Sequence, residues 1–257
     1  MKRIINKYTL TIVGIGLFFL LWYLIFILAG SNIYVFPDPA STIKEAFSYF
    51  SRPYIYKCIW GSLYRMLIGF SIAAVLGIAI GMAVGNYIKI KYVFNPTIIA
   101  LRSIPTAALV FLLLVLVGFK NASLYIVMVI VFPMVYEATV SGYQNIDKDV
   151  LMAMRVDSGN VLANNFKIKL PLSMPYIVVG LTTSFALSFK IEIMAEVITS
   201  SSESYGLGRA IAVAFANQSN GLVSTFAYAF IAIMVMMIVS LLIWIIKTVF
   251  KLKGLSK

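Results

Sequence analysis

Six long hydrophobic stretches, each ending at charged or turn-forming residues, restrict the possible folds of this chain more than any other feature. A helix that crosses the hydrocarbon core of a bilayer needs about 20 predominantly apolar residues. We therefore predict an all-α, polytopic membrane protein, with 1–257 forming a single transmembrane domain. The six predicted transmembrane helices lie at approximately residues 9–30, 62–85, 96–118, 123–142, 172–199 and 222–246.

The overall composition supports the same class. Hydrophobic residues make up 61% of the chain and charged residues only 12%, which is more apolar surface than a soluble domain of this size can bury. The formal net charge of +12 suggests nucleic-acid binding in a soluble protein. Here the Lys and Arg residues gather at the ends of hydrophobic stretches, where they contact lipid headgroups. We expect the lipid bilayer as a partner, and no nucleic acid.

The distribution of basic residues also predicts the orientation, because Lys and Arg beside transmembrane helices are retained on the cytoplasmic side. With the N-terminus inside, both termini are cytoplasmic. The opposite face then holds only Lys44, Arg52, Lys57, Lys120 and Arg209. The cytoplasmic segments hold Lys2, Arg3, Lys7, Lys89, Lys91, Lys148, Arg155, Lys167, Lys169, Lys247, Lys251, Lys253 and Lys257.

The residue inventory argues against an enzyme. The chain has no histidine and a single cysteine, Cys58, so it offers no imidazole for acid–base or metal chemistry and no internal disulfide. It also lacks a Walker-type phosphate-binding loop, so ATP hydrolysis requires a separate chain. We expect no metal, no catalytic residues and no cofactor on this chain.

The stretch from 145 to 170 differs from the other connections because it is long and polar. Apolar residues alternate with charges at a spacing that suits short helices on the membrane surface. Asp157-Ser158-Gly159-Asn160 favours a turn between two such pieces. A partner-binding segment and an ordinary amphipathic connector both fit this pattern.

The same stretch carries a motif that resembles a known family. Permease subunits of binding-protein-dependent ABC importers have a cytoplasmic signature of the form E-A-A, three residues, G, nine residues, I-x-L-P. Met152-Ala153-Met154 through Ile168-Lys169-Leu170-Pro171 matches its spacing. Met152, Met154 and Ser158 stand where the signature has Glu, Ala and Gly, and Gly159 follows one residue later.

Other segments resemble one branch of that family, the permeases for nitrate, sulfonate, taurine and thiamine precursors. The resemblance extends over roughly residues 36–250. It rests on Phe36-Pro37-Asp38-Pro39, on Ser62-Leu63-Tyr64-Arg65 with the glycines that follow, on Arg102-Ser103-Ile104-Pro105, and on Ala195-Glu196 with Gly206-Leu207-Gly208.

The resemblance implies a type I ABC importer permease in the bacterial inner membrane. The implied partners are a second permease subunit, expected to be an identical copy, two ABC ATPase subunits that bind ATP and Mg, and an external substrate-binding protein. The implied contact with the ATPase comprises Ala153, Met154, Asp157, Ser158, Gly159, Asn160 and Pro171. Gly206 and Gly208 lie where the outer gate closes in the family.

Polar residues within the hydrophobic stretches are the other candidates, because an ionised residue at the bilayer centre costs about 2.5–3.5 kcal/mol. They are Arg65, Arg102, Glu137, Lys190, Glu192 and Glu196. Pro105 is a further candidate for the solute path, because it removes a backbone hydrogen bond and is expected to kink or interrupt its helix. Glu192 and Glu196 share a helical face, where two carboxylates repel unless a cation or partner lies between them. Structural ion pairing and a place on the solute path both explain these residues.

Glycines in the second predicted helix recur on one face at Gly69, Gly77, Gly81 and Gly85. They permit close helix packing, either within one subunit or at a moving interface. The alternative function is an ion-coupled secondary transporter or facilitator that works without an ATPase. A sulfonate, nitrate, taurine or a thiamine or pyrimidine precursor all remain open as substrates.

Overall fold

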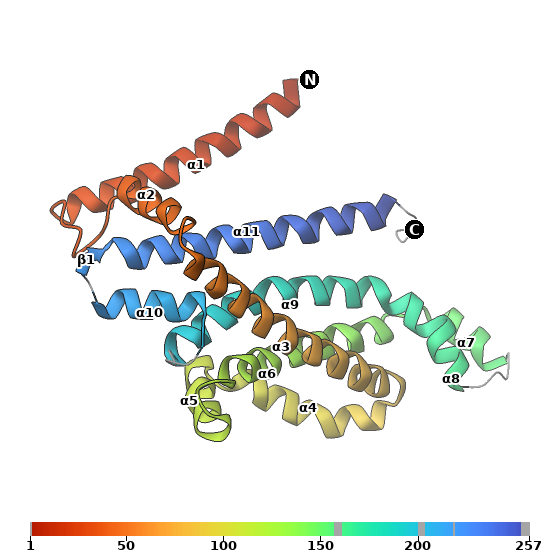
Figure 1. The fold of residues 1–257 in the computed structure, drawn as a ribbon. Helices are drawn as coiled ribbons and strands as arrows, with labels where there is room; N and C mark the ends of the chain where they lie inside the picture. The colour runs from red at the N-terminus through yellow and green to blue at the C-terminus, as the bar shows by residue number, and fades with distance from the viewer. Residues whose placement is uncertain (1, 157–160, 200–203, 218, 253–257) are drawn as a thin grey trace.

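The computed structural model describes residues 2–156, 161–199, 204–217 and 219–252, and these form an almost entirely helical protein (Figure 1). A short π-helical turn, Asn165–Lys169, precedes α9, and a four-residue extended segment, β1 (Ser219–Leu222), precedes α11. The α-helices are α1 (Lys2–Leu28), α2 (Pro39–Tyr49), α3 (Pro53–Asn86), α4 (Ile88–Ser103), α5 (Thr106–Val117), α6 (Ala122–Gln144), α7 (Lys148–Val156), α8 (Val161–Asn164), α9 (Leu170–Thr199), α10 (Leu207–Asn217) and α11 (Val223–Leu252).

Among the described residues, five helices are long and apolar enough to cross a membrane: α1, α3, α6, α9 and α11. The bent pair α4–α5 makes a sixth when it counts as one span. The prediction of an all-α polytopic protein is confirmed in that form. The second helix begins at Pro53, nine residues earlier than the sequence suggested, because Pro is well suited to the first turn of a helix.

The third predicted helix, 96–118, differs from the structure. The chain forms two helices there, bent by 101° at a break between Ser103 and Thr106. Ile104 is extended (φ −69°, ψ 123°), as expected for a residue that precedes proline, and Pro105 has no N–H to continue the helix. Pro96 lies inside α4 and Pro133 inside α6 without ending either helix.

Helices α3, α6 and α9 form the centre of the molecule, and close backbone approach holds α3 against α6. A Cβ on Gly69 lies 2.6 Å from the Leu124 carbonyl oxygen, and one on Gly81 lies 2.6 Å from Thr139 Cβ. Gly77 and Gly85 pack similarly against Val135 and Tyr143. These glycines therefore serve packing within one subunit, because any side chain separates the two helices.

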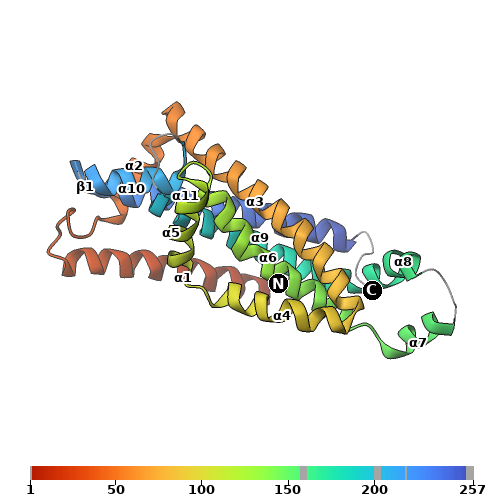
Figure 2. The same cartoon turned by 90° about the horizontal axis from the view of Figure 1, so that it is seen from below.

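The molecule has two distinct ends, which Figures 1 and 2 show from two directions. Helices α7 and α8, the turn from α3 to α4 and the C-terminal end of α11 lie at one end, called here the α7 end. Helices α2 and α10 and the segment β1 lie at the other, called the α10 end. Leu222 N–H donates to the Ile33 carbonyl at 3.0 Å, which ties β1 to the chain after α1.

Helix α1 lies largely outside the bundle, and Figure 1 shows it diverging from α11 toward the α7 end. None of its membrane-length stretch Thr9–Leu28 is buried within this chain. Its described attachments cluster near its C-terminal half, where Trp22 Nε1 donates to the Pro37 carbonyl at 3.0 Å and the Trp22 ring lies 6.1 Å from Phe226.

Candidate functional site

A cluster of three charged side chains is buried where α3 and α9 meet. Arg65 Nε donates to Glu192 Oε1 at 3.0 Å, and Arg65 Nη2 pairs with Glu196 Oε1. The two Glu side chains are 0% and 4% exposed, and Arg65 is 14% exposed. The cation that the spacing of Glu192 and Glu196 required is therefore Arg65, which comes from a different helix.

The same cluster holds the N-terminus of α10. Gly208 N–H donates to Glu196 Oε2 at 2.8 Å, and Leu207 N–H donates to Ser62 Oγ at 2.9 Å. Ser62 in turn donates to the Glu196 carboxylate at 2.8 Å. These bonds use N–H groups that the first turn of a helix leaves without an internal partner, next to a negative charge that favours a helix N-terminus.

The segment just before α10 is fixed by a hydrogen bond to a backbone carbonyl and by close packing against α9. Arg65 Nη2 donates to the Tyr205 carbonyl at 2.8 Å. A Cβ on Gly206 lies 2.6 Å from the Glu196 carboxylate, and one on Gly208 meets the Ile193 carbonyl oxygen. Gly206 and Gly208 are thus required where α10 crosses α9. We call the contacts among Ser62, Arg65, Glu192, Glu196 and the N-terminus of α10 the latch.

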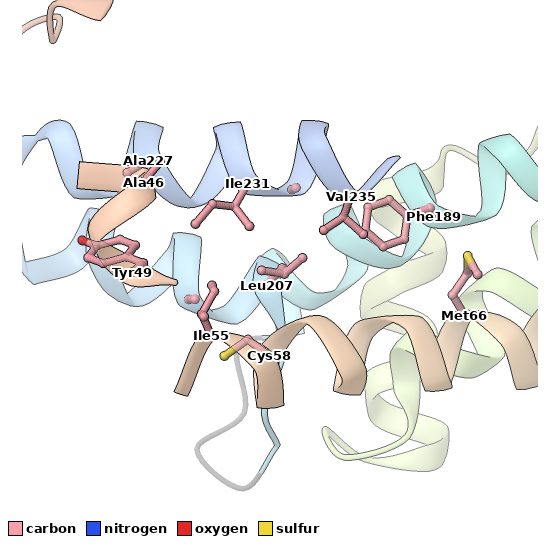
Figure 3. Packing of buried hydrophobic residues seen from close by; sticks show 12 residues of the cluster. Ala46, Tyr49, Ile55, Cys58, Met66, Phe189, Leu207, Ala227, Ile231 and Val235 are labelled. Atoms are coloured by element: carbon pink, nitrogen blue, oxygen red, sulfur yellow. The ribbon is translucent and has the colours of Figure 1, made fainter. Parts of the chain in front are cut away.

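Apolar packing completes the docking of α10. Figure 3 shows Leu207 of α10 between Cys58 of α3 and Ile231 of α11, all three of them fully buried. Ala210 of α10 belongs to the same hydrophobic cluster. Displacing α10 therefore uncovers Cys58, the single cysteine of the chain.

A second pair of charges lies on the rim of an open cavity of about 640 Å³ between α4, α6 and α9. Arg102 at the C-terminal end of α4 pairs with Glu137 of α6, and these side chains are 55% and 44% exposed. Thr183 and Ser184 of α9 line the same cavity. Ser184 is fully buried, and its hydroxyl has no hydrogen-bond partner.

Lys190 lies apart from both charge clusters. It is exposed on α9, on a face that it shares with exposed Thr183 and Leu187 at helical spacing. It forms no ion pair with any described residue. Pro105 marks the break between α4 and α5.

The α7 end carries the predicted ATPase-contact segment. Ala153 and Met154 lie on α7, and Pro171 lies in the first turn of α9. Asp157, Ser158, Gly159 and Asn160 lie outside the described residues. Figures 1 and 2 show α7 and α8 extending beyond the bundle.

Asn86, at the C-terminal end of α3, links this segment to the bundle. Its Nδ2 donates to Asn165 Oδ1 at 2.9 Å, and its Oδ1 accepts from Lys169 Nζ at 2.8 Å. Both partners lie in the π-helical turn that leads into α9. Single π turns inside helices often coincide with functional sites.

The sequence did not single out Ser62, Ser184, Asn86, Asn165 or Lys169 as site residues. Ser62 had a usable signal, because it lies three residues before Arg65 and therefore on the same helical face. Asn86, Asn165 and Lys169 had none, since their contacts join segments distant in the sequence. Ser184 had none either, because its burial depends on how the helices pack.

Comparison with known proteins agrees with this geometry. The family model described as "binding-protein-dependent transport system inner membrane component" matches residues 73–252. A probable ABC transporter permease protein of Brucella melitensis is 26% identical over 188 residues, covering 73% of this chain and 74% of the relative. A nitrate import permease protein, NrtB, of Synechocystis sp. is 27% identical over 197 residues, covering 72% and 70%.

A shorter match, 30% identical over 143 residues, is to a putative aliphatic sulfonates transport permease protein, SsuC, of Bacillus subtilis, and covers 55% of this chain and 51% of the relative. Among solved structures, the inward-facing MetNI methionine ABC transporter matches with a TM-score of 0.66. That match covers 79% of this chain and 97% of the other at 15% identity, and it shows the fold.

The fold and the matched sequence define a multi-pass transport subunit rather than an enzyme. The chain belongs to the family of binding-protein-dependent transport system inner membrane components. It is a permease of the ABC importer class, as its sequence motifs predicted.

Proposed function

We propose that this chain forms half of the membrane path of an ATP-driven importer, paired with a second permease subunit that is an identical copy. Two ABC ATPases, which bind ATP and Mg, act at the α7 end, and an external binding protein delivers the solute at the α10 end. The α7 end, with both termini, is then cytoplasmic.

The observation that carries this proposal is the projection of α7 and α8 from the end of the bundle (Figure 1). A short amphipathic helix outside the bundle is available to insert into a groove on another protein. The Asn86 contacts with Asn165 and Lys169 then transmit its movement to α3 and α9. ATP acts by favouring one of two rigid-body arrangements of the subunits.

We propose a small oxyanion as the solute, in the class of nitrate or a sulfonate. Two of the relatives are permeases for solutes of this class. The exposed face of α9 offers Lys190, which has no ion-pair partner among the described residues, and the cavity beside it offers Arg102 and the unpaired Ser184 hydroxyl. Taurine and thiamine or pyrimidine precursors are the alternatives.

The test is uptake into proteoliposomes that contain this chain, the ATPase encoded beside it and the matching binding protein. We expect uptake of nitrate or methanesulfonate only when ATP is present on the side of the membrane where the ATPases lie. Lys190→Gln lowers uptake and Lys190→Arg preserves it, because only the second variant keeps the charge. Uptake driven by an ion gradient without an ATPase contradicts the proposal and favours a secondary transporter.

A further inference from the structure

The latch contains an imbalance of charge that its geometry does not correct. Two carboxylates, Glu192 and Glu196, share one guanidinium, that of Arg65. No other ion pair among the described residues reaches this cluster. With all three groups ionised, one negative charge remains uncompensated in a site excluded from water, which is unfavourable.

The two carboxylates are not equivalent. Glu196 receives hydrogen bonds from Ser62, Arg65 and the backbone N–H of Gly208, and it lies at the positive end of α10. Glu192 receives one hydrogen bond from a charged donor, Arg65 Nε to Oε1, and the Ser123 hydroxyl lies beside it. Its Oε2 is buried without a hydrogen-bond partner among the described residues. The hydrogen-bond donors of the site therefore stabilise one carboxylate, Glu196, and do not provide equivalent stabilisation for an ionised Glu192.

We propose that Glu192 is a proton-binding site, occupied whenever α10 is docked in the latch. A protonated Glu192 leaves Arg65 and Glu196 as a balanced pair and removes the unpartnered anionic oxygen. The proton comes from water and returns to it. The importer function does not itself require a bound proton, and the site does not depend on which solute is carried.

The groups that face Glu192 are few. Arg65 comes from α3, Glu196 from the next turn of α9, and the buried hydroxyl of Ser123 from α6. The described contacts of α10 with the cluster are backbone N–H groups, and the charged side chain of this helix, Arg209, donates to the Ser204 carbonyl. The α5 residue packed in this region is the apolar Val110. A hydroxyl can donate to an ionised carboxylate or accept from a protonated one, so Ser123 can hydrogen-bond to Glu192 in either state.

Loss of the proton weakens the latch. An ionised Glu192 competes with Glu196 for Arg65, and the repulsion between the two carboxylates is no longer offset. Arg65 also donates to the Tyr205 carbonyl, so its displacement frees the segment that leads into α10. The docking of α10 is then sensitive to pH, through a residue that does not itself touch α10.

The test uses Cys58, which is buried beneath Leu207 and Ala210 of α10 and is the sole thiol of the chain. The rate of maleimide labelling is measured on the assembled complex from about pH 6 to about pH 9, a range that brackets carboxyls held neutral by burial. Each wild-type rate is divided by the rate of Glu192→Gln at the same pH, which cancels the ionisation of the thiol itself.

We expect this ratio to rise with pH by up to about tenfold per unit while Glu192 titrates, because the ionised fraction changes tenfold per unit. Gln imitates the protonated carboxyl, so the variant keeps α10 docked. Gly206→Val, whose side chain collides with the Glu196 carboxylate, gives the rate for a displaced α10. A ratio that is constant across the range overturns the proposal, as does a ratio that responds to sodium at fixed pH.

A second variant covers the case in which Glu192→Gln does not fold. Glu196→Gln leaves Arg65 with Glu192 alone, so the charge is balanced without a proton and the labelling rate loses its excess pH dependence. A pH response equal to that of wild type contradicts the proposed site. Labelling requires neither ATP nor solute, so failure here is distinguishable from failure of the proposed transport function.

Discussion

The two ends of the molecule are attached to the same three central helices in opposite ways. At the α10 end, buried charges, backbone hydrogen bonds and apolar packing fix α10 against α3 and α9. At the α7 end, α7 and α8 extend from the bundle, and the described polar link is the set of contacts around Asn86. The α10 end is stabilised by contacts within the chain, whereas the α7 end leaves its surface available to a partner.

The largest effect is expected from Glu196→Ala, which breaks the latch. Arg65 keeps Glu192, but the Ser62 hydroxyl and the Gly208 N–H lose their acceptor, and each buried group left without a partner costs about 1–3 kcal/mol. The free energy of unfolding in mixed micelles measures this change. Glu137→Ala is the matched control, because the exposed Arg102–Glu137 pair contributes about 1 kcal/mol or less. If the two variants lose the same free energy of unfolding, the buried cluster stabilises the protein no more than the exposed pair does.

The second effect lies at the α7 end and leaves stability unchanged. Ala153→Trp places a large ring on the exposed surface of α7 and is expected to lower affinity for the ATPase at least tenfold, about 1.4 kcal/mol. Co-purification from detergent, titrated with ATPase, measures it. Tyr92→Trp enlarges an exposed ring on α4 instead and keeps the affinity. Full ATPase binding by Ala153→Trp removes α7 from the interface.

A smaller effect is expected where the α7 end joins the bundle. Asn86→Ala removes one hydrogen-bond partner of Lys169 Nζ and one of Asn165, and a typical hydrogen bond contributes about 0.5–1.5 kcal/mol net. Hydrogen exchange across Asn165–Lys169 is expected to speed up while exchange in α10 stays unchanged. Faster exchange in α10 as well means that the two ends are not independent.

The smallest effect concerns the start of α2 at the α10 end. Asp38 caps this helix by accepting from Ser41 N–H at 2.8 Å and from the Ser41 hydroxyl. Burial alone raises the pKa of Asp38, but these hydrogen bonds outweigh it and hold the pKa below its ordinary value. Asp38→Ala is expected to cost about 1 kcal/mol at neutral pH.

The sign of the pH dependence follows from that lowered pKa. The stabilisation by Asp38 is complete above the pKa of the unfolded chain, about 3.9, and is lost as the pH falls through the folded value. Unfolding measured at pH 7 and in acid therefore gives a difference between wild type and Asp38→Ala that shrinks in acid. A difference that grows in acid contradicts the capping role.

Much of this architecture was predictable because hydrophobic length alone reports a membrane span. The spacing of Glu192 and Glu196 on one face also indicated that a cation or another partner lies between them. That the cation is Arg65 was not predictable, since the pair is separated by 127 residues along the chain and depends on how α3 packs on α9. Pro105 indicated an interruption, but the 101° bend depends on the packing of α5 over α6.

The isolation of α1 has a consequence for how its sequence can change. None of the residues in the membrane-length stretch of α1 is buried against the rest of the chain. Over most of this helix, side chains therefore do not have to fit a particular neighbour. Exchange among Leu, Ile, Val and Phe keeps the same solubility in lipid, so substitutions of this kind are close to neutral. Drift in α1 is therefore expected to be rapid, with Trp22, which contacts Pro37 and Phe226, as the position that resists it.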